Sequence, residues 1–391
     1  MISFEDALKK IQENAHTIGT EKVGFENSLN RVLAEDIVSD MDMPPFDKSA
    51  MDGYACRRED LKNELEVIEV IPAGHWPQKK VGRNQCSKIM TGAPLPQGAD
   101  TVIMIEQVKT LADNRIVFTG DDTKSNVCPR GDDVTAGNLV LKKGTLIRAK
   151  HIPVLASVGA VNVKVFKQPR VVVVSTGNEL VEPEIKPGLS QIRNSNGYQL
   201  VCQVKELGIP ANYAGIVKDN FAATKAIFEK TMAEAEVLIM SGAVSVGDYD
   251  YVPDVLKQSG FDIHFHGVYV KPGKRTLFAT HENKWFIGVP GNPVSSFVQF
   301  ETLIKPLLLS ITGNSAMPRF LNLPLEADFK RKNAVRKAYV PVVITQEGLV
   351  KKIEYHGSAH INSLSYADGL MEIEQGIKEI KKGTLVHVRP I

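Results

Sequence analysis

The sequence contains few cysteines and few aromatic residues, and it has almost no excess of either charge. Only four cysteines occur among 391 residues and none forms a CxxC pair, so neither a zinc site nor a dense disulfide framework is indicated. Lysine and arginine number 47 against 45 aspartates and glutamates, and a net charge of +2 is far from the basic excess of nucleic-acid-binding proteins. We therefore expect a cytoplasmic protein with reduced thiols and no nucleic-acid partner.

A long uninterrupted hydrophobic run is also missing. Residues 1–15 mix acidic and apolar residues at helical spacing, which differs from the basic start and apolar core of a secretion signal. The most apolar helix candidate, 293–311, contains Gln299, Glu301 and Lys305, and these side chains would be costly inside a bilayer. The sequence thus predicts neither export nor a membrane partner.

The composition that remains is typical of a soluble globular protein, with 43% hydrophobic and 24% charged residues. A chain of 391 residues is too long for one ordinary core, so several domains are expected. Short alternating runs predict a β-rich subdomain at 44–133. We predict that it is inserted into a helical and linker subdomain formed by 1–43 and 134–168, so that residues 1–168 make one N-terminal region.

The second half of the chain predicts a different architecture. Between 169 and 315, β-branched runs alternate with amphipathic helices, which indicates a three-layer α/β domain with parallel strands and helical crossovers. Strand patterns return over 316–391 and predict a small C-terminal β domain, which we expect to be barrel-like. The predicted fold class is therefore multi-domain α/β plus β.

Three loops of the α/β domain, 175–180, 240–252 and 289–297, follow predicted strands, and ligands of such folds lie beyond the carboxyl ends of the strands. The third loop places Asn292 at a helix N-cap and Pro293 at the first helical position, where free N–H groups attract an oxyanion. The second loop carries small and hydroxyl residues that let backbone N–H groups approach an anion, namely Ser241, Gly242, Ser245 and Gly247. A tight turn and ordinary helix capping are the alternative interpretations of these two loops.

Charged residues accompany the same loops. Lys271, Lys274 and Arg275 surround a Pro-Gly turn and would repel one another unless an anionic ligand or acidic partners neutralise them. Acidic residues follow the strands at Glu179, Asp219, Asp248 and Asp250, and carboxylates that face phosphates need a cation such as Mg²⁺ between them. A solvated turn and turn or cap aspartates are the alternatives.

The remaining polar segments indicate no particular chemistry by their residue types. Asp52 begins an Asp-Gly turn, which is also common in hairpins, and the polar loops 91–100 and 128–134 have residue types that assign no chemistry. His264 and His266 are expected on one strand, and a second histidine pair is His356 and His360. Without a third ligand at suitable spacing, ordinary surface or hydrogen-bonded histidines are favoured over a metal site.

The order of the motifs carries a resemblance to a known family. Six segments follow one another in the order and spacing of the MoeA/gephyrin E-domain family, namely PPFDKSAMDGYA, IMTGAPLPQGADTVIMIEQ, STGNEL, SGAVSVGDYDYV, VKPGKRT and GVPGNPVSSF. A seventh segment, HGSAHINSLSYADGL, resembles that family's closing Gly-Ser segment. The resemblance covers essentially the whole chain. It implies an elongated protomer of four subdomains, including a molybdopterin-binding α/β domain, and a homodimer whose active site lies at the subunit interface.

The resemblance also implies a reaction. The enzymes of this family are molybdopterin molybdenumtransferases, which insert molybdate into adenylylated molybdopterin with Mg²⁺ and release AMP during molybdenum cofactor biosynthesis. Motif positions assign Mg²⁺, nucleotide phosphates and hydrolysis to Asp52, Asp133, Glu179, Asp219 and Asp250, with Glu179, Asp219 and Asp250 as the metal ligands. They assign pterin phosphate or molybdate to Lys271, Lys274, Ser296 and Arg336, together with Ser358 and Ser363. A molybdopterin adenylyltransferase and downstream cofactor-maturation proteins are the implied partners.

Three positions depart from the family pattern. Cys128 stands where the family usually has arginine, Ala243 replaces a glycine, and 357–362 differ from the usual Gly-Ser-Gly form. The neighbouring Arg130 could offset the missing arginine. Two other classes stay open at this point, a binding scaffold like gephyrin and an adenylyltransferase that uses ATP, and tungstate could replace molybdate.

Overall fold

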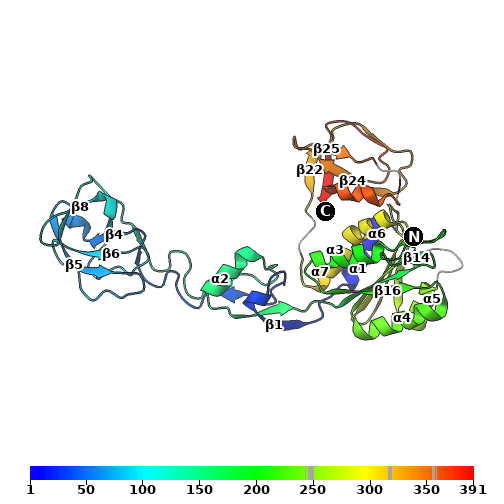
Figure 1. Ribbon diagram of the computed structural model, residues 1–391, viewed down its shortest axis with the longest axis horizontal. Helices are drawn as coiled ribbons and strands as arrows, with labels where there is room; N and C mark the ends of the chain where they lie inside the picture. Colours follow the sequence, from blue (N-terminus) through cyan, green and yellow to red (C-terminus); the bar gives the residue numbers. More distant parts are fainter. Residues whose placement is uncertain (243, 245–250, 316–318, 355–356, 358) are drawn as a thin grey trace. The chain divides into compact units, whose positions relative to one another are not determined.

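The computed structural model describes residues 1–391 except 243, 245–250, 316–318, 355–356 and 358. Several positions named above lie outside the described residues, namely Ala243, Ser245, Gly247, Asp248, Asp250, His356 and Ser358. The chain forms two compact units (Figure 1). One comprises 35–143 and 149–162, and the other comprises 1–34, 144–148 and 163–391. The domain limits given above stay predictions.

The smaller unit is built on a six-stranded sheet in the order β7-β4-β6-β5-β9-β8. Its strands are β4 (Gly53–Cys56), β5 (Glu64–Ile71), β6 (Gln85–Ile89), β7 (Thr101–Met104), β8 (Val108–Thr110) and β9 (Arg115–Phe118). Neighbours are antiparallel except β5 and β6, which are parallel. A Cβ at Gly53 would lie 1.9 Å from the carbonyl oxygen of Ile103, so only glycine allows β4 and β7 to approach this closely.

Short elements complete the smaller unit and the chain segments on either side of it. The strands pair as β2 (Ile37–Val38) with β11 (Leu139–Leu141), β3 (Lys48–Ser49) with β10 (Val127–Cys128), and β1 (Thr20–Gly24) with β12 (Asn162–Phe166). Helix α2 spans Ile152–Ser157, and single helical turns are η1 (Phe25–Asn27), η2 (Arg58–Asp60), η3 (Ile105–Gln107) and η4 (Ala149–His151).

The α/β domain has the predicted three layers. Its sheet runs in the order β16-β13-β17-β21-β20-β18, with β13 (Val171–Thr176), β16 (Ala211–Val217), β17 (Val237–Ser241), β18 (Asp262–His266), β20 (Leu277–His281) and β21 (Lys284–Val289). The first four strands of this order are parallel, as predicted. The prediction of parallel strands is wrong for β20, which is joined to β21 by a tight reversal at 282–283 instead of a helical crossover. Strand β18 pairs antiparallel with β20 and therefore runs in the same direction as β21.

Helices cover both faces of this sheet (Figure 1). The helices are α1 (Phe4–Asn14), α3 (Asn196–Glu206), α4 (Phe221–Glu234), α5 (Val252–Gln258), α6 (Pro293–Gln299) and α7 (Lys305–Ile311). Apolar residues of α1, α3, α6 and α7 pack on one face against Val171 and Ile239, whereas those of α4 and α5 pack on the other against Val174 and Leu238. Because both faces are covered, the central strands are apolar on both sides.

One continuous helix, Pro293–Ile311, is long and apolar enough to cross a membrane by length and composition. Of its apolar window, 72% is buried within the protein, as in the core helix of a soluble protein. A π-helical segment, η5 (Phe300–Ile304), joins α6 to α7. A π-turn frees carbonyl groups from the regular helical pattern, and the Glu301 carbonyl here accepts a hydrogen bond of 2.6 Å from Nη1 of Arg389.

The C-terminal residues form most of a third six-stranded sheet, in the order β19-β24-β26-β28-β22 with β25 paired to β24. The strands are β19 (Val270–Lys271), β22 (Leu321–Pro324), β24 (Lys337–Ile344), β25 (Val350–Lys352), β26 (Gly369–Ile373) and β28 (Leu385–Pro390), and β23 (Phe329–Lys330) pairs separately with β27 (Glu379–Ile380). Two small strands, β14 (Leu180–Val181) and β15 (Ile192–Arg193), and the turn η6 (Ile361–Tyr366) complete the described elements. Strand β19 comes from the α/β part of the chain, so the two domains share a sheet edge.

A buried lysine links the N-terminal helix to this C-terminal sheet. The Nζ atom of Lys337 lies 2.5 Å from Glu372, 2.8 Å from Glu374 and 3.1 Å from Glu5 on α1. Only 9% of Lys337 is exposed. Burial lowers the pKa of this ammonium, but its three carboxylate partners outweigh burial and raise the pKa above its ordinary value. The lysine is therefore charged over the physiological pH range and connects two segments that are distant in sequence.

We expect Lys337→Met to lower the free energy of unfolding by about 3 kcal/mol, because the substitution leaves the half-enclosed Glu372 carboxylate without its cation. Chemical denaturation of both proteins measures the difference. Lys381→Met is the matched control, since Lys381 also pairs with two acids but is 67% exposed, and we expect little change. Equal effects of the two substitutions would contradict a structural role for the buried cluster.

The cysteines are all free thiols, as predicted. Cys56 and Cys86 are distant in sequence but lie opposite each other on β4 and β6, fully buried. Burial raises the pKa of each thiol to about 12, with smaller contributions from Asp100 at Cys56 and from Cys56 at Cys86. Cys202 is exposed and Cys128 is partly exposed.

We therefore expect iodoacetamide at pH 8 to modify Cys202 rapidly in the folded protein and to modify Cys56 and Cys86 only after unfolding, because the thiolate is the reactive form. Peptide mass spectrometry after timed quenching measures the four rates. Modification of Cys56 or Cys86 in the folded protein at the rate of Cys202 would contradict the sheet described here.

Candidate active site

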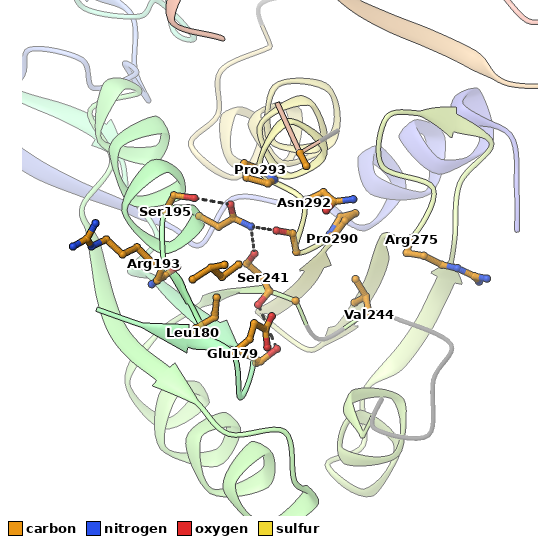
Figure 2. Close-up of a pocket in the computed structure, with 17 residues that line it drawn as sticks. Glu179, Leu180, Arg193, Ser195, Ser241, Val244, Arg275, Pro290, Asn292 and Pro293 are labelled. Carbon is orange, nitrogen blue, oxygen red and sulfur yellow. Dashed lines mark hydrogen bonds between the residues drawn. The ribbon is translucent and has the colours of Figure 1, made fainter. Parts of the chain in front are cut away.

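A cavity of about 450 Å³ opens beyond the carboxyl ends of β13, β17 and β21 (Figure 2). These three strands are parallel neighbours, so the loops that follow them meet at one edge of the sheet. The lining residues come from these loops, from the start of α3 and from the C-terminal segment: Thr176, Glu179, Leu180, Ile192, Arg193, Asn194, Ser195, Asn196, Ser241, Gly242, Val244, Arg275, Pro290, Gly291, Asn292, Pro293 and Ala359. The cavity thus gathers residues from all three predicted loops.

Glycine allows two of these loops to approach each other. Gly242 has φ of +101°, and a Cβ there would lie 2.4 Å from the carbonyl oxygen of Thr176. Its N–H donates to the carbonyl of Val289 at 3.0 Å, and a Cβ at Gly291 would lie 3.6 Å from the Gly242 Cα. Both the conformation and the space at position 242 exclude an ordinary side chain. The cavity wall is here formed by backbone, so a ligand can approach it without meeting a side chain at position 242.

The helix that follows the third loop begins as predicted. Asn292 is the N-cap with an extended backbone, and Pro293 occupies the first turn. The sequence placed Ser296 in this turn, and the structure buries it completely, with no hydrogen-bond partner for its Oγ among the described residues. Ser296 is not part of the cavity lining. The partial positive charge at the start of helix Pro293–Ile311 therefore faces the cavity through Asn292 and Pro293.

The described charged residues in the lining are Glu179, Arg193 and Arg275. Figure 2 shows the two arginine side chains on different sides of the cavity, each extending away from its centre. Glu179 is exposed. Asp219 is outside the lining, and its carboxylate accepts a hydrogen bond of 3.2 Å from the backbone N–H of Asn178 in the adjacent loop. Of the predicted metal ligands, Glu179 is therefore at the cavity, Asp219 lies near the same loop, and Asp250 lies outside the described residues.

A polar network supports the cavity floor. Asn194 donates to the hydroxyl oxygen of Tyr213 at 2.6 Å, and its carbonyl oxygen accepts from Ser175 at 3.0 Å. The Tyr213 hydroxyl donates to Glu182 at 2.9 Å, and Tyr198 donates to the same carboxylate. Burial and the hydrogen bond to Glu182 raise the pKa of Tyr213, so its hydroxyl stays protonated and keeps donating. The network fixes the chain at the start of α3.

The other predicted ligand residues of the larger unit that the structure describes do not line this cavity. Lys271 and Lys274 are exposed. Nη1 of Arg336 donates to the carbonyl of Val270 at 3.2 Å, and the Ser363 hydroxyl donates to the carbonyl of His360 at 2.7 Å. Their assignments to pterin phosphate or molybdate stay predictions.

The smaller unit positions the predicted Asp52 through Thr91. One carboxylate oxygen of Asp52 accepts from the backbone N–H of Thr91 at 2.6 Å and from its hydroxyl at 2.9 Å. These bonds lower the pKa of Asp52, with the backbone bond as the larger contribution. The sequence analysis assigned no chemistry to Thr91, although its place in a polar loop opposite an Asp-Gly turn was the available signal. Asp52 is thus a fixed carboxylate that is ionised at neutral pH.

The second predicted acid of this unit, Asp133, is exposed, and its backbone N–H donates to the carbonyl of Met43 at 3.0 Å. The nearby Arg130 was the candidate to replace the arginine that Cys128 lacks. Its Nε lies 2.6 Å from the carboxylate of Asp42, and its backbone N–H donates to Asp47. The guanidinium of Arg130 is therefore held by an acid of its own unit.

The histidines have no metal partners among the described residues, which contain no group of three or more potential metal-ligating side chains. His264 shares a hydrogen bond of 2.7 Å with the hydroxyl of Thr280, and burial lowers its pKa. This agrees with the interpretation of His264 as a hydrogen-bonded histidine.

Sequence reasoning did not identify the segment Arg193 to Asn196 as part of the site. The available signal was the polar run RNSN directly before a predicted helix, which resembles an ordinary capping sequence. The contribution of this segment depends on the short strand β15, which pairs with β14 and carries the run back to the cavity. That pairing joins segments separated by ten loop residues and leaves no periodic pattern.

Comparisons with known proteins cover nearly the whole chain. Family models match at 2–159 (MoeA N-terminal region, domain I and II), 172–310 (probable molybdopterin binding domain) and 322–391 (MoeA C-terminal region, domain IV). A molybdopterin molybdenumtransferase of Staphylococcus epidermidis is 33% identical over 99% of this chain and 95% of its own length. One of Staphylococcus aureus shows the same identity and coverage.

The solved structures agree. A molybdopterin biosynthesis MoeA protein from Pyrococcus horikoshii is 33% identical, with a TM-score of 0.83 over 100% of this chain and 99% of that chain. A second structure from Pyrococcus horikoshii OT3 is 29% identical with a TM-score of 0.85, and both chains are covered completely. Three family models match successive parts of the chain, and relatives and solved structures match it along nearly its whole length. The chain therefore belongs to the MoeA family.

Proposed function

We propose that this protein is a molybdopterin molybdenumtransferase, which takes adenylylated molybdopterin and molybdate and releases AMP during molybdenum cofactor biosynthesis. The observation that supports it most is the cavity where the loops after β13, β17 and β21 meet, because its backbone wall and helix start suit an oxyanion. The relatives named as molybdopterin molybdenumtransferases match this chain along almost its whole length.

The proposed reaction needs two kinds of chemistry at one place. Water attacks a phosphorus of the pyrophosphate link, the P–O–P bond breaks, and AMP leaves with the bridging oxygen. The two dithiolene thiols then bind molybdenum, one oxide ligand of molybdate is displaced, and the two thiol protons leave with that oxide as one water. The helix start at Asn292 and Pro293, which line the cavity, would hold the phosphate and molybdate oxyanions.

The donor set is compatible with Mg²⁺ without forming a complete site by itself. Mg²⁺ is usually held by one or two carboxylates together with phosphate oxygens and water. Glu179 supplies one carboxylate at the cavity, and Asp219 lies at the neighbouring loop. We propose that these residues, with Asp250, hold Mg²⁺ against the pyrophosphate of the substrate. The ion would neutralise phosphate charge and make the attacked phosphorus more electrophilic.

We further propose that the protein works in the cytoplasm as a homodimer whose active site combines residues of both subunits. The N-terminal acids Asp52 and Asp133 would then act on substrate bound by the α/β domain of the other subunit. An adenylyltransferase that makes adenylylated molybdopterin is the expected source of substrate, and proteins that mature or insert the cofactor are the expected recipients.

The first test is AMP release from adenylylated molybdopterin with molybdate and Mg²⁺. We expect Glu179→Gln to lower kcat/KM by roughly 100-fold or more, because the amide keeps the shape but loses the charge that binds the cation. Glu184→Gln is the matched control, since Glu184 is an exposed acid of the following loop outside the cavity. Wild-type protein that releases no AMP under these conditions would overturn the proposed function.

The composite site has its own test. We expect Asp52→Asn and Glu179→Gln to be nearly inactive separately, whereas mixed dimers with one subunit of each variant should recover about half of wild-type activity. One of the two sites in such a dimer is intact, and the other contains both substitutions. Co-expression with two different affinity tags isolates the mixed dimers, and activity no greater than that of the single variants would exclude a site shared between subunits.

A further inference from the structure

Asn196 joins two walls of the cavity. It is the first residue of α3 and is only 6% exposed. Its Nδ2 donates to Oγ of Ser241 at 2.8 Å and to the carbonyl oxygen of Gly291 at 2.8 Å (Figure 2). Both protons of the side-chain amide are therefore used, and both acceptors line the cavity.

The two acceptors belong to different loops. Ser241 is the last residue of β17, and Gly291 immediately precedes the N-cap of helix Pro293–Ile311. Among the described residues, a backbone hydrogen bond also joins the ends of β17 and β21, from the N–H of Gly242 to the carbonyl of Val289. A Cβ at Gly291 would be only 3.6 Å from Gly242, so glycines leave no side chains to hold the walls at a fixed distance. The Asn196 side-chain amide therefore adds a lateral connection between the end of β17 and Gly291 to the one that the backbone of Gly242 makes.

We propose that Asn196 is a positioning residue, which fixes the spacing between the loop after β17 and the start of the helix and so prepares the cavity for the phosphate oxygens of the substrate. This inference rests on the proposed function for the identity of the substrate. A cavity that is already in the binding geometry avoids the cost of ordering its loops when the anion binds. Loss of the amide should therefore weaken substrate binding without removing a group that reacts.

If Asn196 only stabilised the fold, its loss would lower the stability of the protein without affecting substrate binding. The same helix, α3, contains a residue that serves as a matched control. Gln203 is also on α3, is 5% exposed, and uses its amide to donate to Glu301 at 3.1 Å. Its hydrogen bond lies away from the cavity, since neither Gln203 nor Glu301 is a lining residue. Truncation of Asn196 removes two buried hydrogen bonds to neutral acceptors, and truncation of Gln203 removes one to a carboxylate, so both substitutions should lower the melting temperature.

The experiment compares wild type, Asn196→Ala and Gln203→Ala in two measurements. In saturation kinetics with adenylylated molybdopterin, we expect Asn196→Ala to raise KM by roughly tenfold, because a positioning contact affects binding, and Gln203→Ala to leave KM within about twofold. In hydrogen exchange without substrate, we expect faster exchange of the Gly242 amide in Asn196→Ala alone. If Asn196→Ala does not fold, Asn196→Ser replaces it, since a serine hydroxyl carries one proton and cannot donate to both acceptors.

The outcomes separate this inference from the proposed function. A wild-type KM that Asn196→Ala leaves unchanged would overturn the positioning role, whatever the exchange rates. Unchanged exchange at Gly242 would overturn it as well. If wild-type protein releases no AMP, the proposed function fails, and the exchange measurement alone decides whether Asn196 holds the two loops together.

Discussion

The parallel alignment of β13, β17 and β21 is the constraint on which the candidate site depends. Because the three strands run in the same direction and are adjacent, their three following loops must lie at one edge of the sheet. Each loop then needs a backbone that can approach its neighbours, and the glycines at 242 and 291 allow that approach. The cavity is thus a consequence of strand order and of the absence of side chains at two positions.

The larger unit stabilises this arrangement from outside the cavity. The helix Pro293–Ile311 lies in the core of the α/β domain, and its π-helical turn exposes the Glu301 carbonyl to Arg389 of the last strand. Lys337 connects the C-terminal sheet to α1 through three carboxylates. The C-terminal domain is therefore attached to the same helical layer that begins at the cavity, and a rigid layer is a suitable support for a site that binds an anion.

Much of the fold followed from sequence patterns, because those patterns are local. The runs at 171–176 and 237–241 and the amphipathic helices between them are periodic, and the structure places strands and helices there. The reversed direction of β20 was not predicted, since the reversal at 282–283 shows no strong turn signal. The addition of β19 to the C-terminal sheet depends on a contact between residues about 70 positions apart and has no local signature.

The residues of the candidate site also fall into those that local sequence patterns predict and those that depend on tertiary contacts. Loop residues such as Ser241 and Asn292 follow strands and could be predicted, whereas Asn194 and Asn196 reach the cavity through tertiary pairing.

The central claim is that the substrate's phosphate binds among these loops, and a crystal structure of the protein with AMP, molybdate and Mg²⁺ tests it most directly. The account predicts phosphate or molybdate oxygens within hydrogen-bond distance of Ser241, Gly242 or Asn292. Ligands bound elsewhere, with this cavity containing only solvent, would contradict it.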